Sequence, residues 1–391
     1  MYPNLSYLLH DLFGTARDNG FSVIQMFGLF LGLAFFTAAF ILYKELRRKE
    51  EEGLLVPVKK KILTGIGAKP MDILLNGLFG LIVGMKVPSI IQDFDSFKDD
   101  AAGFIFSSKG NIGLGLLGLL AFGGFTWWQG HKSKLDQPKK VIQSISPSHR
   151  VGDITVIAAI FGLLGARLFS IFENMDAFWQ DPMGQLFAGS GLTIYGGLIL
   201  AFIANYIYVK RHKIPPIHVM DAIAPALILS YGVGRLGCQF SGDGDWGIVN
   251  ELAKPGWFFL PDWAWAYDYP HNVLNEGVAI EGCTDRYCSK LGAPVFPTPI
   301  YEVIGSVIIF LILWILRNKV KFAGFIFFLY ALLMSVERFL IEFIRVNPRY
   351  DFMGAQLSQA QIISIGVFIA GLLGMYYWYR RRDERIVMQV E

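Results

Sequence analysis

The sequence predicts an all-α polytopic membrane protein with about nine transmembrane helices, and three observations indicate this. The chain has 391 residues, of which 53% are hydrophobic and only 17% are charged. Its apolar residues fall in runs of roughly 20, which is the length that an α-helix needs to cross a bilayer. The segments between these runs alternate between rich and poor in basic residues. This composition excludes an ordinary soluble domain.

Nine apolar runs are expected to form the membrane helices. They lie at 22–43, 70–90, 111–130, 152–172, 190–209, 216–236, 299–316, 322–344 and 359–379. The run at 70–90 is the weakest, because it contains Lys86 and Pro88. An odd number of crossings places the two termini on opposite sides of the membrane.

Lysine and arginine are concentrated in every second connecting segment. They follow the first, third, fifth, seventh and ninth runs, as in Arg47–Lys49, Lys132–Lys140, Lys210–Lys213, Arg317–Lys321 and Arg380–Arg385. The positive-inside rule therefore predicts an outer N-terminus and a cytoplasmic C-terminus. No basic stretch precedes the first run, so we expect no cleaved signal peptide. The net charge of +3 gives no indication of nucleic-acid binding.

Three arginines and a tyrosine are expected at one depth of the membrane. Arg167, Arg235 and Arg338 lie near the outer ends of outward-running helices, and Tyr195 lies near the outer start of an inward-running one. Charges within a membrane span are costly and usually face a protein interior or a wet cavity. Because guanidinium groups bind phosphate well, this set predicts a site for an anionic lipid headgroup. The alternative is snorkelling arginines with structural ion pairs, such as Arg338 with Glu342.

Residues 69–132 resemble residues 150–213 without gaps at an offset of 81, with 16 identities in 64 positions. We interpret this as a duplicated two-helix unit. Both copies cross the membrane in the same sense, unlike the inverted repeats of transporters. Lys86 and Leu114 of the first copy stand where the second has Arg167 and Tyr195, so the first copy is predicted to be structural or peripheral.

The segment Gly232–Gly247, which spans the end of the sixth run and the residues after it, combines Arg235 with glycines, Ser241 and two carboxylates. Glycine lets the backbone approach an anion closely and donate N–H groups to it. Asp243 and Asp245 are too few oxygen ligands for a calcium loop, so we expect no metal.

This segment resembles the signature of the prolipoprotein diacylglyceryl transferase family, which has Gly-Arg, Gly, Asn and then Asn-Gly-Glu. Further segments resemble that family in its order, namely Gly165–Arg167, Ser190–Ile199, His218–Pro225, Pro297–Glu302 and Arg338–Arg345. The resemblance covers the first helix and about residue 140 to the end. Four family positions differ: Tyr195 replaces a histidine, Cys238 and Ser241 replace asparagines, and Asp243 replaces a glutamate. Phe27 also stands where the family has a tyrosine. Because the family has asparagine at the position of Cys238, the resemblance favours a packing or polar role for this residue over a covalent nucleophile.

The resemblance implies a seven-helix family core, to which the duplicated two-helix unit is an addition. The expected divisions are 1–43 for the outer N-terminus and first helix, 44–140 for the extra unit, 141–236 for the helices carrying Arg167, Tyr195 and Arg235, 237–298 for a small outer head segment, and 299–391 for the last three helices.

The resemblance also implies the reaction, which is transfer of the diacylglyceryl group of phosphatidylglycerol to the lipobox cysteine thiol of a prolipoprotein. The products are a thioether and glycerol 1-phosphate, and the enzyme works in the bacterial inner membrane without a cofactor. The candidate catalytic residues are Arg235, Arg338, Tyr195 and Asp243, and the candidate substrate-binding residues are Arg235, Arg167, Arg338, Glu342, Ser241 and Gly242. Alternatives are a non-catalytic protein that binds anionic lipid and a transporter with arginines along its path.

The segment 237–298 is expected outside the membrane. It contains Cys283 and Cys288, for which an oxidising exterior favours a local disulfide. It also contains four tryptophans, at 246, 257, 263 and 265, and tryptophan is common at membrane interfaces. We therefore expect a small head that rests at the interface and helps to receive the preprotein, whose signal peptide is an expected partner together with membrane lipids.

Overall fold

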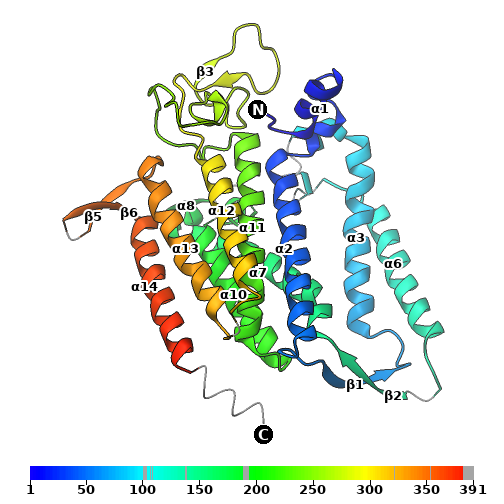
Figure 1. Ribbon diagram of the computed structural model, residues 1–391. Coiled ribbons are helices and arrows are strands. Elements are labelled where there is room, and N and C mark those ends of the chain that lie inside the picture. Colours follow the sequence, from blue (N-terminus) through cyan, green and yellow to red (C-terminus); the bar gives the residue numbers. More distant parts are fainter. Residues whose placement is uncertain are drawn as a thin grey trace. The chain divides into compact units, whose positions relative to one another are not determined.

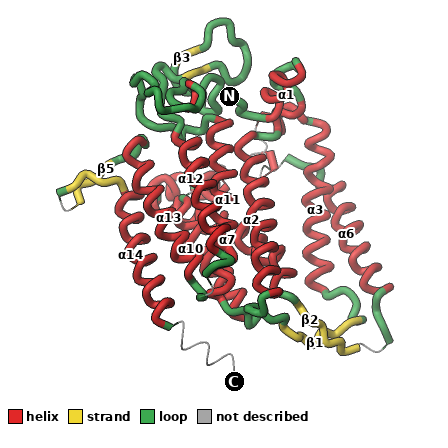
Figure 2. The backbone as a smooth tube through the Cα atoms, in the orientation of Figure 1, coloured by secondary structure: helices red, strands yellow, loops and turns green. Residues whose placement is uncertain are grey.

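The computed structural model describes residues 1–99, 104–105, 107, 109–136, 139–187, 193–320, 322–352 and 354–381. Three residues of the basic segments, Lys321, Arg382 and Arg385, and part of the family-like segment 190–199 lie outside this range. Helices make up most of the described chain, and the described strands form three two-stranded antiparallel sheets (Figures 1 and 2). The chain divides into two compact units, 1–56 with 147–155 and 208–391, and 57–146 with 156–207. We call them unit 1 and unit 2.

Among the residues that the structure describes, seven helices are long and apolar enough to cross a membrane. They are α2 (Met26–Glu51), α3 (Pro70–Gln92), α6 (Ile112–Lys132), α7 (Val151–Glu173) with the turn before it, α11 (Pro216–Ser241), α12 (Thr298–Leu316) and α14 (Gln359–Arg380). Helices also occupy the other two predicted runs, α10 (Ile194–Arg211) and α13 (Phe325–Ile341). They fall short because α13 has 17 residues and α10 ends in two basic residues. A multi-pass membrane protein is therefore confirmed, while nine crossings remain a prediction.

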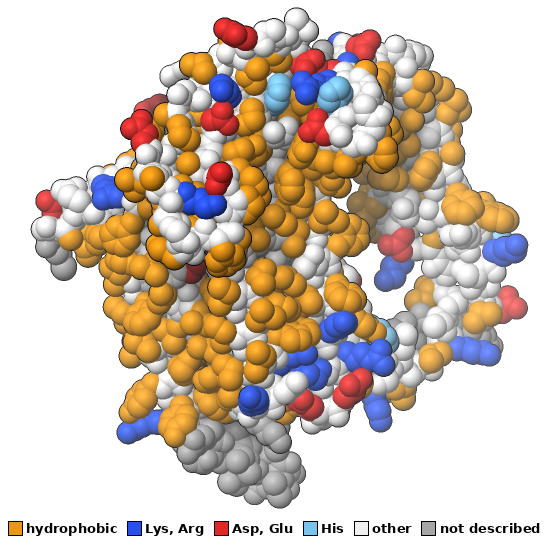
Figure 3. Space-filling view, turned by 45° about the horizontal axis from the view of Figure 1, so that its top comes forward, with side chains coloured by type: hydrophobic (Ala, Val, Ile, Leu, Met, Phe, Trp, Pro, Cys, Tyr) orange, Lys and Arg blue, Asp and Glu red, His pale blue; other side chains and the backbone are white. Residues whose placement is uncertain are grey.

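Unit 1 is built around α11. Half of the hydrophobic membrane-spanning segment of α11 is buried inside the protein, compared with 28% or less for each of the other six membrane helices. It packs against α2, α12 and α13, and buried residues such as Leu46, Ala222, Ile228 and Leu313 form its core. Figure 3 shows hydrophobic side chains over the flanks of the helices, with charged side chains gathered toward their ends. This distribution is the one expected of helices surrounded by lipid.

The two ends of α11 are fixed by different means. At its start, the buried Asp221 carboxylate accepts backbone N–H bonds from Gly324 (2.8 Å) and Phe327 (3.0 Å), so it caps the first turn of α13. Lys49 lies 3.7 Å from the same carboxylate. At its end, Gly242 adopts φ +63°, and a Cβ there would lie 2.9 Å from the Asn272 side chain. Glycine is therefore required where the chain leaves α11.

A loop-rich head joins α11 to α12. It contains the turn η3 (Asp262–Ala264) and the short strands β3 (Val278–Ala279) and β4 (Ser289–Lys290), and it packs on a small core that includes Trp246 and Tyr269. The expected disulfide is present, with Cys283 bonded to Cys288. The remaining elements of unit 1 are α1 (Leu5–Phe13), η1 (Gly20–Val23), η2 (Pro147–Arg150), η4 (Glu342–Ile344), β5 (Arg349–Phe352) and β6 (Ala355–Ser358).

Unit 2 contains the first copy of the repeat and most of the second. Besides α3, α6, most of α7 and most of α10, it has α4 (Phe94–Asp99), α8 (Met175–Gln180) and α9 (Pro182–Phe187). In each copy the two long helices cross at equivalent glycines. A Cβ on Gly84 would lie 2.3 Å from the Leu114 carbonyl, and a Cβ on Gly165 would lie 2.3 Å from the Gly196 carbonyl. Small residues let membrane helices approach this closely.

The basic segments on either side of the first copy pair with each other. The strands β1 (Val58–Thr64) and β2 (Lys139–Ile145) form an antiparallel ladder in which Val58 pairs with Ile145. The prediction of an all-helical chain was wrong here, because the many lysines hide the alternation that marks a strand. In the same copy, Lys86 is buried and donates to the carbonyls of Phe104 (3.0 Å), Ser107 (2.7 Å) and Lys109 (2.6 Å). Its ammonium group thus fixes the segment that connects α3 to α6.

Candidate active site

Arg235 lies in the last two turns of α11, and its side chain is only 9% exposed. Its Nε donates to the Tyr231 hydroxyl (3.0 Å) and lies 3.0 Å from Oε2 of Glu302. Its Nη1 binds Oδ2 of Asp245 and lies 3.8 Å from Sγ of Cys238. Tyr231 precedes Arg235 by one helical turn, so the two side chains share a face of α11. These contacts fix the plane of the guanidinium group.

Glu302 is the central carboxylate of the site. It stands on the first turns of α12 with a side chain that is 0% exposed. Its Oε1 accepts from the Tyr231 hydroxyl (3.0 Å) and from Nη1 of Arg338 (3.2 Å). Its Oε2 lies 3.7 Å from Nη1 of Arg345 as well as 3.0 Å from Arg235. One buried carboxylate therefore brings three guanidinium groups together.

Two of these arginines come from the end of α13. Arg338 is on α13, Glu342 begins η4, and Arg345 follows it, so the spacing of four and three residues keeps all three on one side. Nη2 of Arg338 lies 3.1 Å from Glu342, as expected of an i,i+4 pair. The Arg338 side chain is 21% exposed, against 10% for Arg345. Arg338 is therefore the arginine of the three that is most open to a ligand.

Asp245 bridges Arg235 and Arg345. Its Oδ2 binds Nη1 of Arg235, and its Oδ1 lies 2.5 Å from Nη2 of Arg345. The Thr298 hydroxyl donates to its carbonyl (2.6 Å), which holds the loop against the start of α12. Burial alone would raise the pKa of Asp245, but the charges of Arg235 and Arg345 outweigh burial and lower it to about 2. Asp245 is therefore ionised at every physiological pH.

Asp243 has the opposite electrostatic environment. Burial raises the pKa of this carboxyl, and the nearby charge of Asp245 raises it further. Its Oδ1 accepts a long bond from the Asp245 N–H (3.4 Å). Two neighbouring carboxylates are thus driven apart in pKa, which is a common arrangement when one carries charge and the other handles a proton.

Ser241, Gly242 and Cys238 shape the end of α11. The buried Ser241 hydroxyl donates to the Gly237 carbonyl (2.8 Å), so its own hydrogen is used within the helix. Ligand atoms of Cys238, Asp243 and Asp245 lie within 4.8 Å of one another, a spacing that fits a metal ion. Both Asp245 oxygens, however, already bind guanidinium groups, which supply the positive charge that a metal would.

Arg167 and Tyr195 lie in unit 2, where both are half-buried. Each stands within two residues of the helix crossing at Gly165 and Gly196. The Thr193 N–H donates to the Ala166 carbonyl (3.1 Å), which holds the start of α10 against α7. The structure therefore groups Arg167 with Tyr195, and groups Arg235 with Arg338, Glu342 and Asp243. Convergence of the two groups remains a prediction.

Four residues of the unit 1 cluster were not predicted as site residues. They are Tyr231, Asp245, Glu302 and Arg345. Arg345 had a usable signal, because it follows Arg338 by seven residues and so faces the same side of a helix. Glu302 had no such signal, because its partners Arg235 and Arg338 lie far from it in the sequence.

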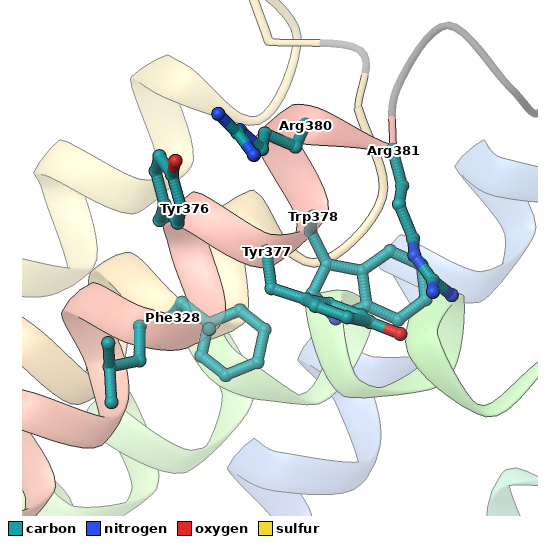
Figure 4. A pocket seen from close by; sticks show the side chains of 8 residues that line it. Phe328, Tyr376, Tyr377, Trp378, Arg380 and Arg381 are labelled. Carbon is teal, nitrogen blue, oxygen red and sulfur yellow. The ribbon is translucent and has the colours of Figure 1, made fainter.

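A separate surface pocket lies at the opposite end of α13 and α14. Figure 4 shows its lining of Phe328, Tyr376, Tyr377, Trp378, Arg380 and Arg381. Phe328 precedes Arg338 by ten residues on α13, which corresponds to about 15 Å along the helix. Arg381 stacks on the Tyr377 ring, with its guanidinium carbon 4.5 Å from the ring centre. This pocket is therefore not part of the arginine cluster.

Comparison with known proteins shows which family this chain resembles. Residues 105–377 match the family model described as prolipoprotein diacylglyceryl transferase. A relative from Finegoldia magna is 31% identical over 224 residues, which are 56% of this chain and 75% of the relative. Relatives from Clostridium novyi and Chromohalobacter salexigens are each 29% identical, covering 57% and 68% of this chain and 77% and 88% of their own lengths. All three bear the name phosphatidylglycerol–prolipoprotein diacylglyceryl transferase.

Proposed function

The chain belongs to the prolipoprotein diacylglyceryl transferase family, and from that premise we propose how its arginine cluster carries out the transfer. The protein is a transferase that moves the diacylglyceryl group of phosphatidylglycerol to a prolipoprotein, the first step of lipoprotein lipidation. The observation that carries the mechanism is the sharing of Glu302 by Arg235, Arg338 and Arg345.

The acceptor is the thiol of the lipobox cysteine in the preprotein signal peptide. Its sulfur forms a bond to the terminal glyceryl carbon of the diacylglyceryl group while the bond from that carbon to the phosphate oxygen breaks. The leaving oxygen keeps the electron pair, so the products are a thioether and glycerol 1-phosphate. The reaction therefore needs stabilisation of the leaving phosphate and removal of the thiol proton.

Arg235 and Arg338 bind the headgroup and the leaving phosphate, and Glu342 orients Arg338. Their planes are already fixed by Tyr231, Glu302 and Glu342, so little reorganisation is needed when charge develops on the phosphate. Each guanidinium has five N–H donors, more than these contacts use. Arg167 contributes a third contact, and the turn at Ser241 and Gly242 brings backbone close to the headgroup.

Asp245 marks the position of a phosphate oxygen. The Asp245 side chain is 32% exposed and lies between Arg235 and Arg345, whose other carboxylate partner, Glu302, is fully buried. A carboxylate and a phosphate present similar pairs of oxygens to a guanidinium fork. The headgroup takes over these donors when it binds, and Asp245 holds the two arginines in position until then.

Asp243 accepts the thiol proton, and Tyr195 is the second candidate for this role. Burial and the charge of Asp245 raise the pKa of Asp243, which makes it a better proton acceptor than an ordinary aspartate. Both residues stand where family members have other side chains, a glutamate and a histidine, as described above.

The protein spans the bacterial inner membrane nine times, with α10 and α13 as the two additional crossings. Its N-terminus lies outside and its C-terminus lies in the cytoplasm, as the basic segments predict. This orientation places the Arg235 end of α11 at the outer leaflet, where phosphatidylglycerol and the preprotein meet.

The decisive experiment combines purified protein, phosphatidylglycerol and a lipobox peptide, and measures by mass spectrometry the peptide carrying an added diacylglyceryl group. We expect Arg235→Ala to fold and insert but to lose transfer by at least about a hundredfold, the usual loss when one preorganised donor is removed. Arg235→Lys retains the charge without the fork and should restore little. The matched control is Arg349→Ala, an exposed arginine outside the cluster.

Near-wild-type transfer by Arg235→Ala would contradict the assignment of Arg235 to the binding of the headgroup and the leaving phosphate. An absence of transfer by the wild-type protein, with phosphatidylglycerol still bound, would favour a non-catalytic protein that binds anionic lipid. Movement of lipid across vesicles without peptide modification would favour a transporter.

A further inference from the structure

The head exposes two aromatic rings on one loop. The Trp257 side chain is 75% exposed and Phe259 is 92% exposed, and Leu252 and Trp263 of the same loop are also exposed. The other two tryptophans of the head serve different purposes, since Trp246 is buried in its core and Trp265 packs against Phe296. Exposed aromatic side chains are therefore concentrated in 252–263, which we call the aromatic loop.

Hydrogen bonds close the aromatic loop from both sides. Nζ of Lys254 donates to the Leu260 carbonyl and to the Asp262 carboxylate, each at 2.8 Å. The Phe258 N–H donates to the Pro255 carbonyl (3.0 Å), which forms a turn that carries Trp257 and directly precedes Phe259. The hydrogen-bonded loop thus holds the two rings exposed to water, because it does not fold back onto the head.

The base of the loop is fastened to the start of α12. The Tyr301 hydroxyl, on the first turn of that helix, donates to the Ala264 carbonyl (2.8 Å). Nε1 of Trp265 donates to the Leu252 carbonyl (2.8 Å), and the Trp265 ring lies 5.7 Å from the Phe296 ring, just before α12. Since α12 is apolar enough to cross a bilayer, these contacts hold the loop at the level where α12 enters the lipid.

We propose that the aromatic loop inserts Trp257 and Phe259 into the lipid interface of the leaflet at the Thr298 end of α12. Aromatic rings are favoured in that interface, and a fixed apolar surface gains free energy when it leaves water. The loop is uncharged in effect, because Lys254 is paired with Asp262. Insertion therefore depends on the rings and not on attraction to anionic lipid. The proposal is independent of the transferase chemistry.

The test uses the full chain in nanodiscs of phosphatidylethanolamine and phosphatidylglycerol. A nitroxide is attached at Phe259→Cys, and its accessibility to oxygen and to a water-soluble nickel chelate is measured by electron paramagnetic resonance. The control is Glu281→Cys, an exposed position between β3 and β4 of the same head. The native Cys238 is buried and Cys283 and Cys288 are bonded, so they do not compete for the label.

We expect oxygen to relax the Phe259 label more than nickel does, the reverse at Glu281, and no change when the salt concentration is raised. A water-like Phe259 label overturns the proposal. Protection that develops only when a lipobox peptide is added assigns the loop to the preprotein and overturns it too. Trp257→Cys repeats the measurement if Phe259→Cys fails to fold.

Discussion

At the scale of single residues, the site depends on Glu302. A buried carboxylate loses several kcal/mol of hydration, and only well-placed partners offset that loss. Glu302 has three guanidinium groups and the Tyr231 hydroxyl around it. In return it holds three like charges together, which would otherwise repel one another. The buried negative charge of Glu302 thus holds the three arginines together.

Asp243 leads to a prediction about pH. Its pKa is raised, so it loses its proton only at a pH above the usual aspartate range, and a base works only in the deprotonated form. Transfer should therefore fall as pH is lowered through this raised value. Asp245, with a pKa of about 2, stays ionised and contributes nothing to this change.

The measurement is the rate of peptide lipidation against pH for the wild type and for Asp243→Asn. We expect the variant to lose most of its activity and the remainder to lack the acidic decline. An unchanged acidic decline in Asp243→Asn would transfer the role of base to Tyr195 or to another group.

The sequence identified Arg235, Arg338 and Glu342, because charge within an apolar run is conspicuous. It identified Asp243 through the segment Gly232–Gly247, which resembles the family signature. It did not identify Glu302 and Asp245 as site residues. Both pair with Arg235, which lies 67 residues before Glu302 and 10 residues before Asp245. Such pairings depend on which helices pack side by side, and the local sequence pattern does not show this. Tyr231 was missed for a related reason, since one tyrosine in an apolar helix does not stand out.

At the scale of secondary structure, the apolar runs located the helices and misplaced several ends. The first run was expected at 22–43, whereas α2 runs from Met26 to Glu51, because charged residues extend a helix as readily as apolar ones once it leaves the lipid. The cap that Asp221 provides for α13 could not be read from sequence, since 103 residues separate it from Gly324.

The glycine crossing of α3 and α6 gives a prediction at this scale. A Cβ on Gly118 would lie 2.1 Å from the Gly80 carbonyl, whereas a Cβ on Gly124, on the same helix, meets nothing within 4 Å. Gly118→Val should force the helices apart and lower the free energy of unfolding by about 1–3 kcal/mol or more.

Thermal unfolding in detergent, compared between Gly118→Val and Gly124→Val, measures this difference. Equal stability of the two variants would show that the crossing is not tightly packed in the membrane.

At the scale of the whole molecule, the first repeat copy is predicted to be dispensable for the chemistry. The copy contains none of the residues assigned a catalytic role, and its Lys86 is occupied by three carbonyls. Removal of residues 58–145 joins positions that already lie side by side, because Val58 pairs with Ile145. Directly outside them, Glu50 accepts from the N–H and hydroxyl of Ser148 (2.7 and 3.0 Å).

We expect the shortened chain, closed with two glycines, to insert in the membrane and to retain peptide lipidation. The readouts are membrane expression, a single peak in size-exclusion chromatography and the mass-spectrometric assay. A well-folded shortened chain without transfer would show that the first copy contributes to the site.

The β1–β2 ladder also bears on how such a chain could have arisen. A tandem duplication normally disturbs the protein that receives it, because it pushes the flanking segments apart or reverses the direction of every later helix. Here the inserted piece enters and leaves at paired strands, and it adds an even number of predicted crossings. Both problems are thereby avoided, so an ancestor could have gained this segment, and a descendant could lose it, without any change to the helices that follow.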